Sequence, residues 1–508
     1  MSLSIALVPV LFIIAGLLGI CRNIYSLLKL RQHLIALVPE PEKAQGFHGH
    51  FSKDLTKSRA QLLSWVNSKP KICRLNRAFI PTVCVCHPET ISQLFASNPP
   101  KFWYVMDFLK EFLGDGLINS TGLRWHRDRK LLSPLFGGTM LRKYVQDLSS
   151  VAKTMVDQFT IRSADNELFD GESIFQLVTF DAIMRCMLGV DIDSWTNAKS
   201  SPVEQYKHAV KYLAQESAKR PTNPVLHSNF IYYLTSEGRK YTRQLSIANA
   251  FADNIIEERR GTLASRTNPD GACSDGVSAC NMLDIMLKAE DEDGNGLSNT
   301  DIRHHVNTFL EAGHDTTSTV MQWAVYYLQE HQDIQERCRQ EIQTVLGDSG
   351  LERLSLDDLS QMEYLLQFIN ETLRHASVTP LLFRRLDKET EIGGYVLPAG
   401  TPIQVLLFSL HHNPLVWKDP EAFDPSRFSP ERTASRLSNS FFPFGVGARN
   451  CIGRQFAITE LKILICSVLL SFRILPRRKS SEEIPAWVPR LVARPEPGIK
   501  FQLELLQH

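Results

Sequence analysis

The chain has 508 residues, of which 43% are hydrophobic and 22% are charged, so it is long and apolar enough to bury a large core. Its 56 Lys and Arg side chains almost balance 55 Asp and Glu side chains and leave a formal net charge of +1, which argues against nucleic acid or another polyanion as a partner. The 10 cysteines show no C-x-x-C pair and no zinc-site spacing, a pattern that favours a reducing, cytosol-facing compartment.

A charge-free apolar stretch opens the chain. Residues 3–21 read LSIALVPVLFIIAGLLGIC, close to the ~20 residues that a helix needs to span a bilayer. We expect a transmembrane anchor here, after which Arg22, Lys29 and Arg31 keep the following chain in the cytosol. A cleaved signal peptide, which carries positive charge before its apolar run, and a buried core helix are the alternatives. The prolines of VPEPEK then favour a juxtamembrane segment and hinge over residues 22–45.

The body that follows is predicted to be mainly α-helical with small β-sheets. Apolar residues recur at helical spacing near residues 141–159 and again over 301–346. Strand-like patterns are fewer and lie near residues 71–86 and over 390–405, where a Gly-Gly turn separates short apolar runs. Residues 261–280 are rich in small and polar side chains without periodicity, so we expect an exposed loop between helices.

An acidic stretch from Asp291 imitates the start of a calcium-binding loop. The twelfth position of such a loop should be a bidentate glutamate, but it is Ile302 here. The calcium interpretation therefore fails, and a polar turn is expected in its place. Ser298 and Asp301 have the spacing of a capping box, which predicts the start of the next helix.

The sharpest signal is the segment FGVGARNCIG at residues 444–453, which precedes an apolar run with helical periodicity. It resembles the haem-binding signature F-x-x-G-x-R-x-C-x-G of the cytochromes P450. The resemblance implies that the Cys451 thiolate is the axial ligand of the haem iron, that Phe444 shields the sulfur, and that Arg449 pairs with a haem propionate. Gly453 suits a close approach of the backbone to the macrocycle, and backbone donors after the cysteine are expected to lower the pKa of its thiol. An isolated cysteine would be a buried structural thiol, but the match at every fixed position favours the iron ligand.

A second motif lies inside a long predicted helix over residues 300–330, where AGHDTT begins at Ala312. A glycine inside a helix costs roughly 1 kcal/mol relative to alanine, so the cluster indicates a purpose other than helix stability. It resembles the A-G-x-D-T-T oxygen-activation motif of the same superfamily. The resemblance implies that Thr316 contacts the iron-bound oxygen and that Asp315 relays protons through water. The alternative is a threonine hydroxyl that bonds back to a preceding carbonyl and bends the helix.

A third motif is E-x-x-R, matched by Glu371 and Arg374, whose spacing puts both side chains on one helix face. Such a pair is usually a surface salt bridge. The resemblance instead implies a structural triad on the proximal side of the haem, with Arg427 as the third member.

Three further residues concern the haem propionates by resemblance. Trp125 and Arg129 reproduce a W-x-x-x-R helix pattern, and Arg384 lies where these enzymes place another propionate-binding arginine. Without the other motifs, a tryptophan and an arginine four residues apart would more often be a stacked surface pair.

Together these motifs occur in the superfamily's order, so the chain is identified as a member of the cytochrome P450 superfamily, most similar to family 4. That similarity is carried by LDIMLKAEDEDGNGLSNTDIRHHVNTFLEAGHDTTS, LHHNPLVWKDPEAFDPSRFSPE and PRLVARPEPGI. It implies the mainly α-helical P450 fold, with residues 46–508 as one catalytic domain. It also implies haem b, O2 and NADPH electrons delivered by cytochrome P450 reductase, with cytochrome b5 as a further partner. The expected place is the endoplasmic reticulum membrane, with the catalytic domain facing the cytosol.

The chain departs from family 4 at two places. Many members esterify a glutamate before the glycine of the long helix to a haem methyl, whereas this chain has Ala312 there. Glu311 is one residue away and is rotated by roughly 100° around the helix, so we expect non-covalent haem. After Arg374 the chain reads HASVTPLLF in place of an L-Y-P-P-like sequence, in a region that lines the substrate pocket of relatives. The apolar residues expected by resemblance to line that pocket, each of which could equally be core, are Phe108, Phe112, Leu113, Ala312, Val378 and Leu382.

The leading hypothesis is a monooxygenase that hydroxylates a long-chain lipid, such as a fatty acid or an eicosanoid, at or near its omega carbon. A haem-thiolate isomerase or dehydratase of lipid peroxides is the main alternative, although the pair Asp315 and Thr316 is typical of enzymes that activate oxygen. A non-catalytic haem carrier or gas sensor is disfavoured because the chain has no recognisable signalling domain. A membrane scaffold without haem is disfavoured by the complete cysteine loop.

Overall fold

The computed structural model describes residues 25–26, 28–42, 50, 54–77, 80–164, 167–191, 201–266, 281–290, 296–347, 350–351, 353–477 and 485–506. The anchor predicted at residues 3–21, the acidic stretch 291–295 and most of the loop predicted over 261–280 lie outside these ranges. Within the described part of the chain, no helix combines the length and the apolar character needed to cross a bilayer.

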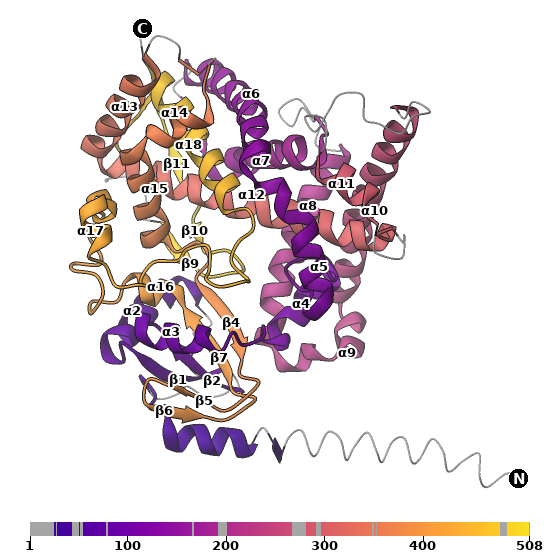
Figure 1. The fold of residues 1–508 in the computed structure, drawn as a ribbon, viewed down its shortest axis with the longest axis vertical. Coiled ribbons are helices and arrows are strands. Elements are labelled where there is room, and N and C mark those ends of the chain that lie inside the picture. Colours follow the sequence, from indigo (N-terminus) through magenta and orange to yellow (C-terminus); the bar gives the residue numbers. More distant parts are fainter. Residues whose placement is uncertain are drawn as a thin grey trace, which may run out of the picture.

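The prediction of a mainly helical body is confirmed (Figure 1). The long helix α12 (Asn299–Glu330) runs through the middle of the molecule, with most of its residues buried. The helix α18 (Arg454–Ser471), predicted after the cysteine loop, is also buried on most sides, as expected for an apolar helix inside a core. The other α-helices are α2 (Ser58–Ser68), α3 (Pro88–Ala96), α4 (Trp103–Leu113), α5 (Gly122–Leu132), α6 (Gly138–Ser163), α7 (Gly171–Ile183), α8 (Pro202–Lys219), α9 (Asn229–Leu234), α10 (Ser236–Arg266), α11 (Met282–Lys288), α13 (Gln332–Leu346), α14 (Leu356–Gln361), α15 (Glu363–Ala376), α16 (Leu407–His411) and α17 (Pro430–Ala434).

The strands form small sheets, as predicted. The largest described sheet has the order β1-β2-β7-β4, in which only the β2–β7 pair is parallel. Gly393 and Gly394 connect β5 to β6 with φ angles of 61° and 82°, which a two-residue hairpin turn requires and which glycine adopts without strain. The strands are β1 (Ile72–Arg77), β2 (Ile80–Val85), β3 (Phe169–Asp170), β4 (Leu381–Arg385), β5 (Thr390–Ile392), β6 (Tyr395–Leu397), β7 (Pro402–Leu406), β8 (Phe472–Ile474), β9 (Ala486–Val488), β10 (Arg494–Glu496), β11 (Lys500–Phe501) and β12 (Leu503–Leu505).

The start and the middle of α12 both follow from its sequence. Ser298 caps the helix, since its Oγ accepts the Asp301 backbone N–H at 3.1 Å, as the capping prediction required. At Gly313 a Cβ would lie 2.3 Å from Cδ1 of Ile183, so the glycine allows α7 to cross α12 closely. Thr179 of α7 fixes the crossing by donating its hydroxyl to the His314 carbonyl at 2.9 Å.

The loop predicted over residues 261–280 is wrong at its start, because residues 261–266 continue α10. A long helix that has already nucleated gains a hydrogen bond for each residue it adds. The Thr262 hydroxyl donates to the Glu258 carbonyl at 3.0 Å, so this polar side chain is satisfied within the helix. Local composition therefore understated the length of α10.

The described part of the predicted hinge packs against the sheet. Residues 28–37 are helical, and the helix ends before Pro39 as expected. Leu34 and Val38 are fully buried in the core cluster that includes β2 and β7. The Arg74 backbone N–H donates to the Pro39 carbonyl at 2.9 Å, which ties this segment to β1.

Candidate active site

A cavity of about 330 Å³ lies between α12 and the loop that carries Cys451. Apolar side chains form most of its wall, and a few hydroxyl and basic groups complete it. The predicted residues that line it are Trp125, Arg129, Ala312, Thr316, Val378, Leu382, Arg384, Phe444, Arg449, Cys451 and Gly453. The fold thus gathers at one cavity residues that span most of the chain.

The cysteine loop is closed by its own backbone. The Cys451 N–H donates to the Phe444 carbonyl at 2.7 Å, and the Asn450 N–H donates to the Gly447 carbonyl at 3.1 Å. Gly445 and Gly447 have φ angles of 74° and 75°, a backbone conformation that other residues rarely adopt. These turns hold Cys451 just before α18, where it lines the cavity.

The thiol of Cys451 is exposed to the cavity and is the only exposed free cysteine among the described residues. The surrounding protein raises its pKa through desolvation, while the Gly453 backbone N–H and the Arg129 and Arg454 guanidinium groups act in the opposite direction. The Gly453 backbone donor thus lowers the pKa of the thiol, as expected, but desolvation outweighs it and the net shift is upward. A metal cation at the sulfur would reverse that balance.

Four basic side chains gather at the cavity wall: Lys101, Arg129, Arg384 and Arg449. Their hydrogen bonds go to neutral oxygens: Lys101 donates to the Ile118 carbonyl at 2.6 Å, and Arg449 donates to the Ser120 carbonyl at 2.6 Å. The Arg449 guanidinium also stacks on the Trp125 ring at 4.1 Å. Within the described chain, no carboxylate pairs with any of the four.

The charges of this cluster disturb one another. Burial and the neighbouring Arg449 and Arg384 lower the pKa of Lys101 to about 7. Burial, with Arg384 and Arg129 nearby, lowers the pKa of Arg449 to about 10. Gathered cations without a counter-ion fit an anionic ligand. A flat macrocycle with two carboxylates, held beside a cysteine sulfur, matches this donor set, so the cavity fits haem.

Lys101 is the member of the cluster that sequence reasoning missed. It stands in the stretch NPPKFW, which carries no motif. A β-bridge joins its backbone to that of Arg384, so the contact is formed between segments far apart in the chain. A long-range contact of this kind leaves no local sequence signal.

The second motif divides between the two faces of α12. Ala312, Gly313 and Thr316 line the cavity, and the Thr316 hydroxyl donates to the Ala312 carbonyl at 2.7 Å. This contact is the alternative described above, in which a threonine hydroxyl bonds back to a preceding carbonyl, and here it lies at the cavity wall. Asp315 does not line the cavity: it is buried on the other side of the helix and forms an ion pair with Arg494 of β10.

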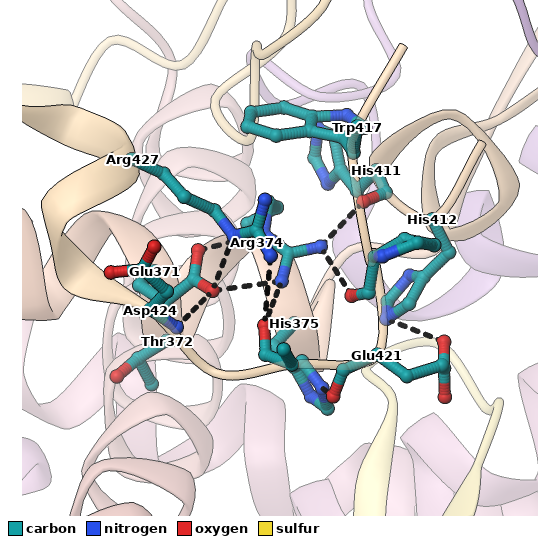
Figure 2. A network of polar contacts seen from close by, with 12 residues as sticks. Glu371, Thr372, Arg374, His375, His411, His412, Trp417, Glu421, Asp424 and Arg427 are labelled. Carbon is teal, nitrogen blue, oxygen red and sulfur yellow. Dashed lines mark hydrogen bonds and ion pairs between the residues drawn. The ribbon is translucent and has the colours of Figure 1, made fainter. Parts of the chain in front are cut away.

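The residues of the third motif meet in one buried network (Figure 2). Arg374 donates Nε to Glu371 Oε2 at 2.7 Å and Nη2 to Oε1 at 2.8 Å. Its other N–H groups donate to the carbonyls of His411, Pro420 and Ala422, so all of its donors are satisfied. The Arg427 Nε, in the short helix η9 (Pro425–Phe428), lies 3.4 Å from Glu371 Oε1, which brings the three residues of the predicted triad together.

The predicted pocket residues also divide into two groups. Ala312, Val378 and Leu382 line the cavity. Phe108, Phe112 and Leu113 of α4 are buried but are not among its lining residues. Apolar character predicted their burial, and only the fold decides which cavity, if any, a buried side chain reaches.

Comparisons with known proteins agree with these motifs. The family model described as Cytochrome P450 matches residues 39–503. The human protein "Cytochrome P450 4F2" is 34% identical over 432 residues, which cover 84% of this chain and 81% of that protein. The rat protein "Cytochrome P450 4F4" is 33% identical over 510 residues, which cover 96% and 94%.

A solved structure supports the fold independently. The crystal structure of the cytochrome P450DA heme domain matches with a TM-score of 0.80 and 22% identity, covering 92% of this chain and 98% of that one. The sequence motifs, the fold and the cavity that contains Cys451 thus point to the same enzyme class. The chain belongs to the cytochrome P450 family, is most like family 4, and is a monooxygenase with a haem-thiolate centre.

Proposed function

We propose that this enzyme hydroxylates a long-chain lipid, such as a fatty acid or an eicosanoid, at or near its omega carbon. The observation that carries the proposal is that Thr316 and Cys451 line one cavity whose remaining wall is mostly apolar. Ile118, Ile183 and Phe309 contribute to that wall, and side chains of this kind favour an alkyl chain over a polar substrate. The resemblance to family 4 supports the same substrate class.

The cavity residues have separate roles in holding haem b. Cys451 would supply the thiolate that binds the iron, and Phe444 and Gly453 line the cavity with it. The side chains of Lys101, Arg129, Arg384 and Arg449 would pair with the propionates, and Trp125, on which Arg449 stacks, would support them from the wall. When bound, the haem supplies the activation of O2 that the protein's own side chains cannot provide.

Protons for the reaction reach the cavity through α12. The Thr316 hydroxyl lies in the cavity wall and can hold a proton at Oγ1. Asp315 carries a carboxylate on the other face of the helix, where Arg494 fixes its position. From that face Asp315 would supply protons through water to Thr316, whose hydroxyl would hold them at the cavity wall.

The haem is held without a covalent bond in this proposal. Ala312 stands at the position where many family-4 enzymes have the haem-linking glutamate, and it lines the cavity. Glu311 is buried and is not among the lining residues. Acid-organic extraction should therefore remove the haem from the polypeptide, and haem retained after extraction would contradict this part of the proposal.

The proposal places the enzyme in the endoplasmic reticulum membrane, anchored by residues 3–21 with the catalytic domain facing the cytosol. Electrons come singly from NADPH through cytochrome P450 reductase, and cytochrome b5 is a further partner. The apolar, charge-free sequence of residues 3–21 supports the anchor.

The test is a reconstitution of the full chain with NADPH-cytochrome P450 reductase in phospholipid vesicles, with palmitic or arachidonic acid as substrate. Under isotopically labelled O2, we expect a hydroxy acid that carries one labelled oxygen near its methyl end, formed only when NADPH and reductase are present. Thr316→Ala should increase the share of electrons that leave as hydrogen peroxide. Rearrangement of a fatty-acid hydroperoxide without NADPH, and no labelled hydroxy acid, would favour an isomerase instead.

A further inference from the structure

A second, much smaller cavity lies against α12 on the side of Asp315. Its volume is about 20 Å³, and its polar lining comes from α7, α8, α12 and β10. The charged and titratable groups that line it are Lys207, Lys211, Glu311, His314, Asp315 and Arg494. The Lys211 side chain is 43% exposed, so the rim of this cavity reaches solvent.

Glu311 is the unusual member of this group. Only 4% of the residue is exposed, and within the described part of the chain its carboxyl makes no hydrogen bond and no ion pair. Burial, and next the negative charge of Asp315, raise its pKa well above the ordinary value, against the opposing effect of Arg494. Burial and the neighbouring negative charge both favour the protonated form of this carboxyl.

The space beside Glu311 suits a water molecule. A cavity needs roughly 10–15 Å³ of this kind of volume, and polar partners, to hold one water, and this cavity of about 20 Å³ meets both conditions. The Tyr206 hydroxyl of α8 is also buried and has no hydrogen-bond partner among the described groups. Burial, and next the charge of Glu311, raise its pKa.

We propose that Glu311 stores a proton for the monooxygenase reaction and passes it to Asp315 through a water molecule held in this cavity. The inference rests on the role proposed above for Asp315. The Glu311 O–H bond breaks as its proton moves to the water, and the same water gives another proton to the Asp315 carboxylate. Glu311 regains a proton from solvent through the rim near Lys211, so no proton is lost in a cycle.

The other charged groups at the cavity do not replace Glu311. Arg494 pairs with Asp315 and with Glu172, whose Oε1 lies 3.3 Å from Arg494 Nη1. Lys207 forms an ion pair with Glu204, and Lys211 forms one with Glu172. His314 is held by a hydrogen bond between its Nδ1 and the Leu310 carbonyl, and burial lowers its pKa, so it is neutral and cannot supply the proton.

The direct test is infrared spectroscopy of the full-length enzyme in H2O and D2O, in which protonated carboxyl groups give separate C=O bands. Glu460 of α18 offers a matched control, because it is also buried with a raised pKa but does not line this cavity. We expect Glu311→Gln to remove one band at neutral pH and Glu460→Gln to remove another. The Glu311 band should exchange in D2O before the Glu460 band and should shift in Asp315→Asn, while the Glu460 band should not shift.

Turnover with reductase adds a second readout. For Glu311→Gln we expect the rate to fall on the order of tenfold, less than the ~100-fold that loss of a direct general acid typically costs. The substrate KM should stay unchanged, and Glu311→Asp should restore most of the rate. The proposal is overturned if Glu311→Gln removes no carboxyl band or if the Glu311 band exchanges no faster than that of Glu460. Failure of lipid hydroxylation alone would instead count against the substrate, since the infrared result is independent of it.

Discussion

Two groups of cationic side chains in this enzyme differ in how their charge is balanced. Arg374 and its partner Glu371 are both fully buried, and every N–H of Arg374 has an acceptor within the protein (Figure 2). The cavity cluster of Lys101, Arg129, Arg384 and Arg449 has neutral acceptors only.

The charges of the Glu371–Arg374 network are balanced within the protein, whereas those of the cavity cluster are balanced only when a ligand binds. Removing one partner of a buried ion pair leaves an uncompensated charge, which is costly. The Glu371–Arg374 pair is of this kind, so removing either side chain should destabilise the folded protein. The cavity cluster carries positive charge without a counter-ion in the described part of the protein. Binding of an anionic ligand would therefore offset the cost of burying that charge.

The largest expected effect comes from breaking the buried Glu371–Arg374 network. Glu371→Gln leaves Arg374 buried without its carboxylate, so we expect the free energy of unfolding to fall by about 3–5 kcal/mol. Denaturant unfolding measures this change. Glu89→Gln, which breaks the exposed pair with Lys71, is the control and should leave the free energy of unfolding almost unchanged. Equal losses in both variants would mean that the Glu371 network adds no more than a surface pair.

The cavity cluster should respond differently, through ligand affinity. Arg449→Leu removes one charged donor at the proposed propionate site, worth about 1.5–3 kcal/mol, so haem affinity should fall by roughly 10- to 100-fold. The stability of the haem-free chain should fall by less, because a cation without a counter-ion is removed. Spectroscopic haem titration and denaturant unfolding measure the two quantities. Arg432→Leu, at an exposed pair with Asp424, is the control, and an unchanged haem affinity in Arg449→Leu would remove that residue from the site.

The smallest expected effect is a dependence of haem affinity on pH, which arises from Lys101 of the cavity cluster. In the haem-free protein the pKa of Lys101 is lowered to about 7, so the lysine is charged below that pH and loses its proton above it. Pairing with a propionate requires the charged form, so haem binding takes up a proton above pH 7. Affinity should therefore fall as the pH rises through 7, by up to about tenfold per pH unit.

Lys101→Met should bind haem more weakly at low pH and should lack this pH dependence. Lys110→Met, on an exposed lysine that pairs with Asp115, should keep it. A pH dependence that survives in Lys101→Met would assign the titration to another group.

The parts of this site that the sequence predicted are those that are local. The cysteine loop lies within residues 444–453, and its turns at Gly445 and Gly447 depend only on neighbouring backbone. The pair Glu371 and Arg374 lies on one turn of α15. Periodicity likewise predicted α6 and α12, because each has enough apolar residues to outweigh its local breaks.

The parts that the sequence did not predict depend on contacts between distant segments. Arg494 reaches Asp315 across 179 residues, and Lys101 reaches the cavity through its bridge to Arg384. Phe108, Phe112 and Leu113 show the same limit, since hydrophobicity predicts burial but not the cavity that a side chain faces. Glu311 gains its surroundings only when α8 and β10 pack against α12.

The central claim is that Cys451 holds a haem iron through its thiolate, and the carbon monoxide difference spectrum of the dithionite-reduced full-length protein tests it most directly. We expect the long-wavelength Soret band from which the family takes its name, and we expect that band to be lost in Cys451→Ser while the protein stays folded. A folded protein without haem, a band typical of histidine or neutral thiol ligation, or a thiolate band that survives in Cys451→Ser would contradict the claim.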